Sequence, residues 1–555
     1  MLPSKKSNKA TCKVSAARIN KIGAGVDAVP STETHMMTAG GFSWVRFTWM
    51  VMLLPLTLAA QSASQSRPNI LFCIADDWGW PHAGAYGDSV VKTPAFDRIA
   101  REGALFTHCY AASPSCTPSR NAILTGQYHW RLGAGANLWS SLDRKIQVYP
   151  LLLEANGYEI GHWRKSWGPG KLKPGGYTEK HPAGPRYPKG LAQFLKARAD
   201  NAALSPDDAA AKPFCFWLGS YDPHRDYQAG SGKASGMDLN QIKVPGFWPN
   251  VEQIRSDIAD YYLEVQRFDN DVQNALELLE ESGELEDTIV VVTGDHGMPF
   301  PRCKSNCYEM GLRVPLAIRW GKRIDAAQQV NALTSLVDLM PTFLAAAKVA
   351  PTPDINGHSW WPLLSGNDLP TDANAGTIQP AREHAIFGKE RHVPCRPDHS
   401  GYPSRGIRTA RWAYIRNFEP SRWPVGNPPL YGDTDPARAI GKGTTKGYLL
   451  THSEEDSVRA FYQLCFGLRP IEELYDMTAD PDQLINLAGL AEHQEIKNKL
   501  WLRLRRELTA TKDPRVIGGA EQFDRYPYYG GSAWRPAPSR NNTRKKDAVN
   551  KDAGK

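Results

Sequence analysis

Hydrophobic and polar positions form two kinds of pattern in the first two thirds of the chain. Short, continuous apolar runs end in polar residues, which is typical of strands buried on both faces. Four such runs are predicted as strands: 70–75, 105–110, 213–219 and 288–293. Between the runs, apolar residues recur at helical spacing, most clearly over 257–281, and we predict further helices from Pro94 and over 333–349. This alternation predicts an α/β fold with a large, mostly parallel sheet between helices.

Three of the predicted strands are followed by residues that carry chemistry. These residues are Asp76-Asp77, Asp222-Pro223-His224 and Asp295-His296. Ligands of parallel sheets bind at the carboxyl ends of the strands. We therefore expect three clusters of acidic and histidine side chains to meet at one edge of the sheet.

The composition of the chain changes after a main domain that we place at 67–370. Pro, Gly and Trp become dense, and the predicted elements are a short strand over 406–415 and a helix over 483–508. We predict a smaller α+β subdomain over 371–520. A basic, disordered tail is expected over 521–555.

One apolar run, 47–60, is long enough to concern a membrane. It has fourteen residues with an internal proline, which is short for a span of about 20 residues. A basic residue precedes it and small residues follow it, which is typical of a secretory signal. We place the signal at 36–64 and interpret residues 1–35 as an extension or a misassigned start. The expectation is an exported protein, periplasmic or secreted, with no stable membrane span.

Composition and charge narrow the class only a little. The chain has 555 residues, of which 41% are hydrophobic and 22% charged, and this excludes a wholly disordered chain and a coiled coil. Of the net charge of +8, residues 1–46 carry +5 and residues 536–555 carry +4, which leaves −1 for the body. The positive charge lies at the two ends, so we do not infer nucleic-acid binding.

Nine cysteines are present without a CxxC pair, which excludes a zinc ribbon. The spacing of Cys303 and Cys307 leaves a disulfide between them open, since export permits a disulfide without requiring it.

The segment Cys116-Thr117-Pro118-Ser119-Arg120 is the most informative in the chain. Pro118 suits the first turn of a helix, where its missing N–H is not needed. Cys116 would then lie at a helix N-terminus, where free amides and the helix dipole favour an anion. Arg120 comes round to roughly the same face. By itself, this segment allows either a reactive thiolate or a buried structural cysteine.

With Leu124-Thr125-Gly126 downstream, this segment resembles the Cys-x-Pro-x-Arg signature of the type I sulfatases of the alkaline-phosphatase superfamily. The family's other motifs are present on both sides of this segment, in the same order as in the family. The resemblance covers about residues 67–510. It implies an alkaline-phosphatase-like fold with one bound Ca²⁺. It also implies a partner maturase that oxidises Cys116 to formylglycine.

The resemblance also assigns the metal ligands. Asp76, Asp77, Asp295 and His296 match the family's metal positions, together with the oxidised side chain at position 116. Carboxylate and aldehyde-hydrate oxygens suit a hard cation such as Ca²⁺. The imidazole nitrogen of His296 is the less typical ligand.

The remaining catalytic positions are basic. Arg120, Lys165 and Lys304 match residues that stabilise the sulfate oxygens, and His224 matches a histidine that gives a proton to the leaving group. The chain departs from the family's Gly-Lys-x-His motif, because arginine replaces the glycine before Lys165 and Trp167 stands where many members have histidine. This departure puts a leaving-group contact at position 167 in doubt.

Within the family, three segments look like heparan N-sulfatases (N-sulfoglucosamine sulfohydrolase, or sulfamidase): 222–225, 297–301 and 473–476. The implied substrate is a sulfated glycan carrying N-sulfated glucosamine, while O-sulfated algal polysaccharides stay open. His392, Arg396 and Arg405 are candidates for binding a sugar carboxylate or a second sulfate, and each has a structural alternative.

Two other functions compete with this interpretation. One is a phosphatase or phosphodiesterase on the same fold, although those relatives generally use a Ser or Thr nucleophile and two zinc ions. The other is a catalytically silent protein that binds sulfated glycans.

Overall fold

A computed structural model describes residues 67–204, 212–367, 382–434 and 443–531. The predicted signal over 36–64 and the extension over 1–35 lie outside these ranges, so both stay predictions. Within the described ranges, no helix has the length and apolar character needed to cross a membrane.

A large mixed sheet forms the centre of the main domain. Its strands run in the order β3-β4-β1-β5-β6-β2-β7, and β8 pairs with β2 at the far edge. The strands are β1 (Asn69–Ala75), β2 (Ala104–Tyr110), β3 (Glu159–Arg164), β4 (Phe214–Gly219), β5 (Thr288–Gly294), β6 (Arg313–Arg319), β7 (Gln328–Val330) and β8 (Thr334–Ser335). Only β6 runs antiparallel to its neighbours, which are β5 and β2. The predicted α/β fold with a mostly parallel sheet is therefore confirmed.

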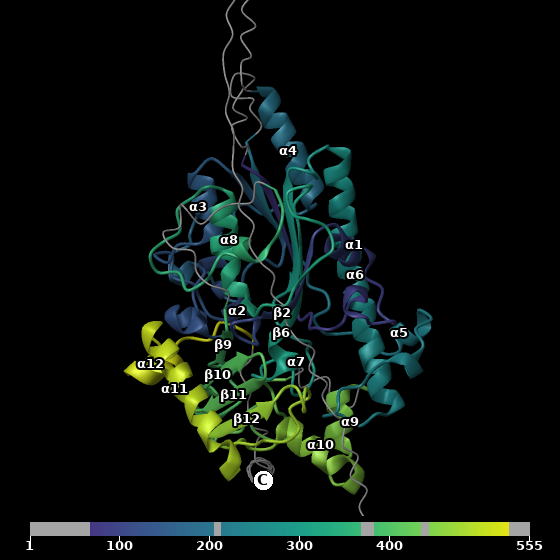
Figure 1. Ribbon diagram of the computed structural model, residues 1–555, viewed down its shortest axis with the longest axis vertical. Coiled ribbons are helices and arrows are strands. Elements are labelled where there is room, and N and C mark those ends of the chain that lie inside the picture. Colours follow the sequence, from purple (N-terminus) through teal and green to yellow (C-terminus); the bar gives the residue numbers. More distant parts are fainter. Residues whose placement is uncertain (1–66, 205–211, 368–381, 435–442, 532–555) are drawn as a thin grey trace, which may run out of the picture. The chain divides into compact units, whose positions relative to one another are not determined.

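Helices cover both faces of this sheet (Figure 1). The helices of the main domain are α1 (Pro94–Glu102), α2 (Cys116–Thr125), α3 (Tyr149–Ala155), α4 (Leu191–Leu204), α5 (Ser231–Ala234), α6 (Glu252–Glu281), α7 (Glu309–Leu312) and α8 (Leu339–Ala346). Strand residues alternate between the two faces. On β1, Leu71 and Cys73 pack in the core shared with α1 and α6, whereas Ile70 and Phe72 pack in the core shared with α3 and α8. This double burial explains the continuous apolar runs in the sequence.

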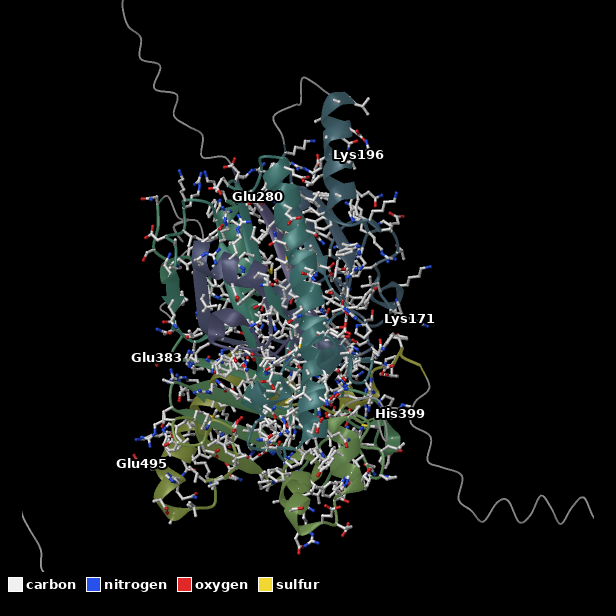
Figure 2. All side chains as sticks on the ribbon, turned by 90° about the vertical axis from the view of Figure 1, so that its right-hand side faces the viewer. Lys171, Lys196, Glu280, Glu383, His399 and Glu495 are labelled. Carbon is white, nitrogen blue, oxygen red and sulfur yellow. The ribbon has the colours of Figure 1, made fainter. Side chains whose placement is uncertain are left out.

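A second, antiparallel sheet forms the smaller part, with the order β12-β11-β10-β9. Its elements are β9 (His384–Lys389), β10 (Ser404–Thr409), β11 (Trp412–Asn417), α9 (Thr445–Thr451), α10 (Asp456–Phe466), β12 (Glu472–Asp476), α11 (Gln494–Ala510), α12 (Pro514–Ile517) and α13 (Gln522–Arg525). Leu500, Leu504 and Leu508 of α11 share an apolar core with this sheet. Glu495 on α11 lies at the opposite end of the molecule from Lys196 on α4 (Figure 2).

Several predicted element boundaries are wrong for local reasons. The predicted helix 333–349 begins only at Leu339, because β8 pairs with β2 and a capping box between Ser335 and Asp338 starts the helical turns. The predicted strand 406–415 is a hairpin of two strands, β10 and β11. The predicted helix 483–508 begins at Gln494, after an irregular segment.

The predicted disordered tail over 521–555 also begins too early. Residues 522–525 form α13, and Phe523 is buried in the core beneath α11. Residues 532–555 lie outside the described ranges. Cys307 is a free, buried thiol, so it forms no disulfide with Cys303.

Candidate active site

Helix α2 begins at Cys116, as the Pro118 position predicted. Ser115 precedes it in extended conformation, and Gly126 ends it in the left-handed conformation, with φ of 61°. Every residue of α2 is buried. The first turn of this helix therefore presents Cys116 at a fixed place inside the protein.

Cys116 faces the carboxyl ends of β1 and β5. These strands pair in parallel, with Ala75 opposite Gly294, so the residues that follow each strand meet. The backbone N–H of Asp77 donates to Asp295 Oδ1 at 2.9 Å. Cys116 Sγ lies 3.4 Å from Asp76 Oδ1. The expected convergence of the strand-end clusters is thus present.

The four predicted metal ligands form two donor groups that share Cys116. Asp77, Cys116 and His296 offer ligand atoms within 4.8 Å of one another, and so do Asp76, Cys116 and Asp295. His296 Nδ1 lies 3.0 Å from the Gly297 carbonyl oxygen, which assigns the proton to Nδ1 and leaves Nε2 as the ligand nitrogen. The three carboxylates fit a hard divalent cation such as Ca²⁺, and the imidazole of His296 stays the less typical ligand.

Each carboxylate of this set has a basic partner. Lys165 Nζ pairs with Asp76 Oδ2. Lys304 Nζ lies 2.6 Å from Asp77 Oδ2, and Arg120 Nε lies 2.8 Å from Asp295 Oδ2. The structure therefore brings together all three basic residues that the sequence predicted.

These charges control ionisation in the buried site. Burial by itself would raise the pKa of Asp76, but the charges of Lys165, His224 and Arg120 outweigh burial and hold that pKa well below its usual range. Burial lowers the pKa of Lys304, and the Asp77 carboxylate more than compensates and raises it. Asp76 is therefore ionised and Lys304 is charged.

Cys116 is a protonated thiol in this environment. Burial, followed by the Asp76 charge, raises the pKa of its thiol. The reactive-thiolate alternative is therefore disfavoured by the electrostatics of the site. A thiol that stays protonated is a poor nucleophile, which is consistent with chemistry that depends on modification of this side chain.

Arg120 is buried beside the site and holds its backbone and Asp295 in place. Its side chain is fully buried, and its two terminal nitrogens donate to the carbonyl oxygens of Lys165 at 2.7 Å and Ala75 at 3.2 Å. Ser119 Oγ donates to the Asp295 carbonyl oxygen at 2.6 Å. Helix α2 thus fastens the ends of β1, β3 and β5 around Cys116.

A cavity of about 780 Å³ opens onto Cys116. It is lined by Asp76, Cys116, Leu138, Trp139, Arg164, Lys165, Trp167, Pro169, Gly170, Tyr221, Asp222, His224, Arg225, Pro299, Lys304, His392, Val393, Gly432 and Asp433. Its volume is in the range of small-molecule sites. Asp76, Lys165, His224 and Lys304 lie in its wall, whereas Arg120 is not among the lining residues.

His392 is the one predicted substrate contact that the structure places in the cavity wall. Its Nδ1 lies 2.8 Å from Ser115 Oγ, directly before the helix that carries Cys116. Burial holds the pKa of His392 well below its usual range, so the imidazole is neutral.

The structure does not bring Arg396 or Arg405 to the cavity. Arg405 is fully buried and paired with Asp513 and Glu390, while Arg396 pairs with Asp433 at 2.6 Å. Their donors are used inside the protein, so the prediction that they bind substrate is wrong for this arrangement. Arg396 instead holds Asp433, which does line the cavity.

Sequence reasoning missed Trp139 and Asp433. Neither lies in a motif or follows a predicted strand, and both reach the cavity from irregular segments. The one signal in the sequence is the aromatic character of Trp139, which many buried tryptophans share.

Comparisons with known proteins identify the family of this chain. A family model described as Sulfatase matches residues 68–349. An ulvan-active sulfatase of Formosa agariphila is 29% identical over 464 residues, covering 80% of each chain. The human N-sulphoglucosamine sulphohydrolase is 27% identical over 503 residues, covering 81% of this chain and 92% of the relative.

Solved structures share the fold. A protein in complex with its substrate D-glucosamine-2-N,6-O-disulfate superposes with a TM-score of 0.54 at 22% identity, covering 81% of this chain and 99% of that chain. A 2-O GAG sulfatase superposes with a TM-score of 0.55 at 18% identity, covering 86% and 100%.

Proposed function

The chain belongs to the sulfatase family, and we propose that it removes sulfate from a sulfated saccharide by means of an oxidised side chain at position 116 and a calcium ion. The observation that carries the proposal is the position of Cys116, whose Sγ lies 3.4 Å from Asp76 Oδ1 and 3.3 Å from His296 Nε2. The side chains of Asp77, Asp295, Lys165 and Lys304 lie around the same residue.

Asp76, Asp77, Asp295 and His296 would hold the calcium ion beside position 116. When bound, the ion supplies positive charge, and the formylglycine derived from Cys116 supplies an oxygen nucleophile in place of a thiol. Burial of all four ligands would keep bulk water from competing for the ion.

Lys165 and Lys304 would stabilise the sulfate oxygens. Both line the cavity, and both ammonium groups are held by carboxylates of the metal set. Negative charge that develops on the oxygens around sulfur is stabilised by such prearranged cations in a water-poor site. Arg120 would position Asp295 and the two strand ends without touching substrate.

His224 would hold the proton for the leaving group. Its Nδ1 lies 2.6 Å from the Arg225 carbonyl oxygen, which leaves Nε2 toward Asp77 Oδ2 at 3.9 Å. Burial and the nearby Lys304 charge lower the pKa of His224, which favours release of a proton from its imidazole. Proton delivery would assist departure of either an alcohol or an amine.

The substrate class follows from the cavity and from the relatives. The named relatives act on ulvan and on N-sulphoglucosamine. The cavity is large enough for more than a sulfate group and carries aromatic side chains beside the charged ones. We propose His392 as a neutral contact for the sugar, at the edge of the cavity next to Ser115.

Two further parts of the proposal concern the cell. The apolar run over 47–60 would export the chain to the periplasm or the medium. Besides its saccharide substrate, the chain would have a formylglycine-generating maturase as a partner. The maturase must act on Cys116 before α2 is buried, because Cys116 is only 2% exposed in the folded chain.

The proposal is tested by sulfate release from N-sulfated glucosamine and from O-sulfated ulvan and glycosaminoglycan saccharides. Protein coexpressed with a maturase should release sulfate from at least one of them, and Cys116→Ala should release none. Peptide mass analysis should find an aldehyde at position 116 in the active protein. An unmodified thiol in active protein, or equal activity in Cys116→Ala, would refute the mechanism.

The competing functions predict other outcomes. Hydrolysis of 4-nitrophenyl phosphate with two zinc ions per chain would favour a phosphatase. Tight binding of a sulfated saccharide by fully matured protein, with no sulfate released from any substrate, would favour a silent binding protein.

A further inference from the structure

Trp139 has an unusual backbone conformation beside the catalytic residues. Its φ is 52°, in the left-handed region. A bulky side chain is a conformational outlier there, because its Cβ crowds the carbonyl oxygen that follows. Such outliers persist only where the surroundings enforce them, and they concentrate at functional sites.

Three segments enforce this conformation. The Tyr529 N–H donates to the Trp139 carbonyl oxygen at 2.7 Å. On either side, the Leu138 N–H donates to the Arg391 carbonyl oxygen at 3.1 Å, and the Lys171 N–H donates to the Ser140 carbonyl oxygen at 2.9 Å. Segments from three distant parts of the sequence thus hold the backbone around Trp139, which is one of the residues that line the cavity.

The indole of Trp139 has no structural role in the core. The side chain is half-buried, and among the described residues it joins no apolar cluster, no ring pair and no hydrogen bond. Trp167, also half-buried and in the cavity wall, differs in two of these respects. It packs against the core and donates from Nε1 to Asn121 Oδ1 at 2.6 Å.

The cavity that Trp139 lines is the one that contains Cys116, Lys165 and Lys304. A ligand held by its sulfate at these residues therefore extends its remaining atoms along the same walls. The apolar, hydrogen-bearing face of a sugar ring complements the electron-rich face of an indole.

We propose that Trp139 is the stacking platform for a pyranose ring of the substrate, and that its strained backbone is kept because it holds the indole toward that ring. This inference rests on the proposed function, since it takes the substrate to be a saccharide. It assigns Trp139 to positioning and specificity, with the sulfate held by the charged residues.

Binding to inactive protein tests the platform. Full-length Cys116→Ala protein with calcium is titrated with sulfated disaccharides and, separately, with inorganic sulfate. Adding Trp139→Ala should weaken saccharide binding about 5- to 10-fold, the size of one aromatic contact, and leave sulfate binding unchanged. Trp139→Phe should keep most of the affinity. Trp501→Ala, a half-buried tryptophan on α11 outside the cavity lining, is the matched control.

A stability measurement tests the strain. Glycine adopts a φ of 52° without penalty, whereas alanine does not. Trp139→Gly should therefore unfold at a higher temperature than Trp139→Ala, although both lose saccharide affinity to the same extent. A residue retained only for packing would show no loss of saccharide affinity in either variant.

The outcomes separate this inference from the proposed function. Unchanged saccharide affinity in Trp139→Ala, equal loss of saccharide and sulfate affinity, or no saccharide binding at all would overturn the platform. If matured protein releases no sulfate while the binding results hold, the sulfatase proposal fails and the platform stands. If sulfate is released and Trp139→Ala binds normally, only the platform fails.

Discussion

Lys304 Nζ contacts both oxygens of the Asp77 carboxylate, at 2.9 and 2.6 Å, across 227 residues of sequence. Both side chains are buried. Asp77 is a candidate metal ligand, and Lys304 lines the cavity, so this ion pair joins the candidate metal site to the cavity wall.

Removal of the lysine should damage catalysis more than folding alone explains. Under the proposed function, Lys304→Met takes away a cation that stabilises the sulfate oxygens, and we expect kcat to fall by about 10²- to 10³-fold. The variant also removes the lysine partner of the Asp77 carboxylate, so its affinity for calcium should be higher than that of the parent. Steady-state kinetics at saturating calcium measure the effect. Lys322→Met, at an exposed position, is the control and should match the parent.

Calcium should stabilise the folded protein as well as activate it. A cation that binds the carboxylates of the folded protein, and not the unfolded chain, stabilises the folded state, so a chelator should lower the melting temperature and abolish activity, and calcium should restore both. At a calcium concentration of about 100 times Kd, the gain in unfolding free energy is about 2.7 kcal/mol. Asp295→Asn should lose most of this stabilisation. A calcium-independent melting temperature in the parent would contradict the metal assignment.

Arg405 should prove structural. It is fully buried between Asp513 and Glu390, so Arg405→Ala leaves the buried Asp513 without its ion-pair partner and Glu390 with Arg515 alone, and should cost about 3–5 kcal/mol. The folded fraction should keep its KM, because Arg405 lies outside the cavity lining. Arg411→Ala is the matched control, since this arginine is 60% exposed in its pair with Asp476 and should change stability by less than about 1 kcal/mol. Urea denaturation and kinetics separate the two effects.

Acid should destabilise the protein through a pair of stacked histidines. The rings of His162 and His181 lie 4.2 Å apart. Burial lowers the pKa of His162 to about 4 and the pKa of His181 to about 3. In the unfolded chain a histidine has a pKa of about 6.5. The unfolded state therefore takes up these protons first, so stability is complete above about pH 6.5 and falls as the pH drops toward 4.

For His162 alone this loss is about 3 kcal/mol at pH 4. His162→Asn keeps a donor for the Gly184 carbonyl oxygen, which His162 Nδ1 contacts at 2.9 Å, but cannot titrate. It should flatten the stability profile between pH 6.5 and 4 in urea denaturation. His399→Asn, at an exposed position, should leave the profile unchanged. If His162→Asn loses as much unfolding free energy as the parent between pH 6.5 and 4, other groups cause the acid destabilisation.

Much of this protein is determined by the sequence alone. The apolar runs identify strands buried on both faces, because such strands need apolar residues at every position. Asp76, Asp77, Asp295 and His296 directly follow such strands, and parallel pairing of β1 with β5 brings their carboxyl ends together. The meeting of these side chains was therefore predictable from local patterns and from the parallel arrangement that they imply, whereas their expected roles came from the resemblance to the sulfatases.

Tertiary structure decided what local patterns do not encode. Whether an arginine reaches substrate or an internal acid depends on partners far along the chain, and Arg405 finds Asp513 across 108 residues. Trp139 becomes a cavity residue because the distant backbones of Arg391 and Tyr529 hold its own. The reason is physical: strand and helix patterns arise from interactions between near neighbours, whereas the walls of the cavity are assembled from irregular segments whose positions depend on long-range contacts.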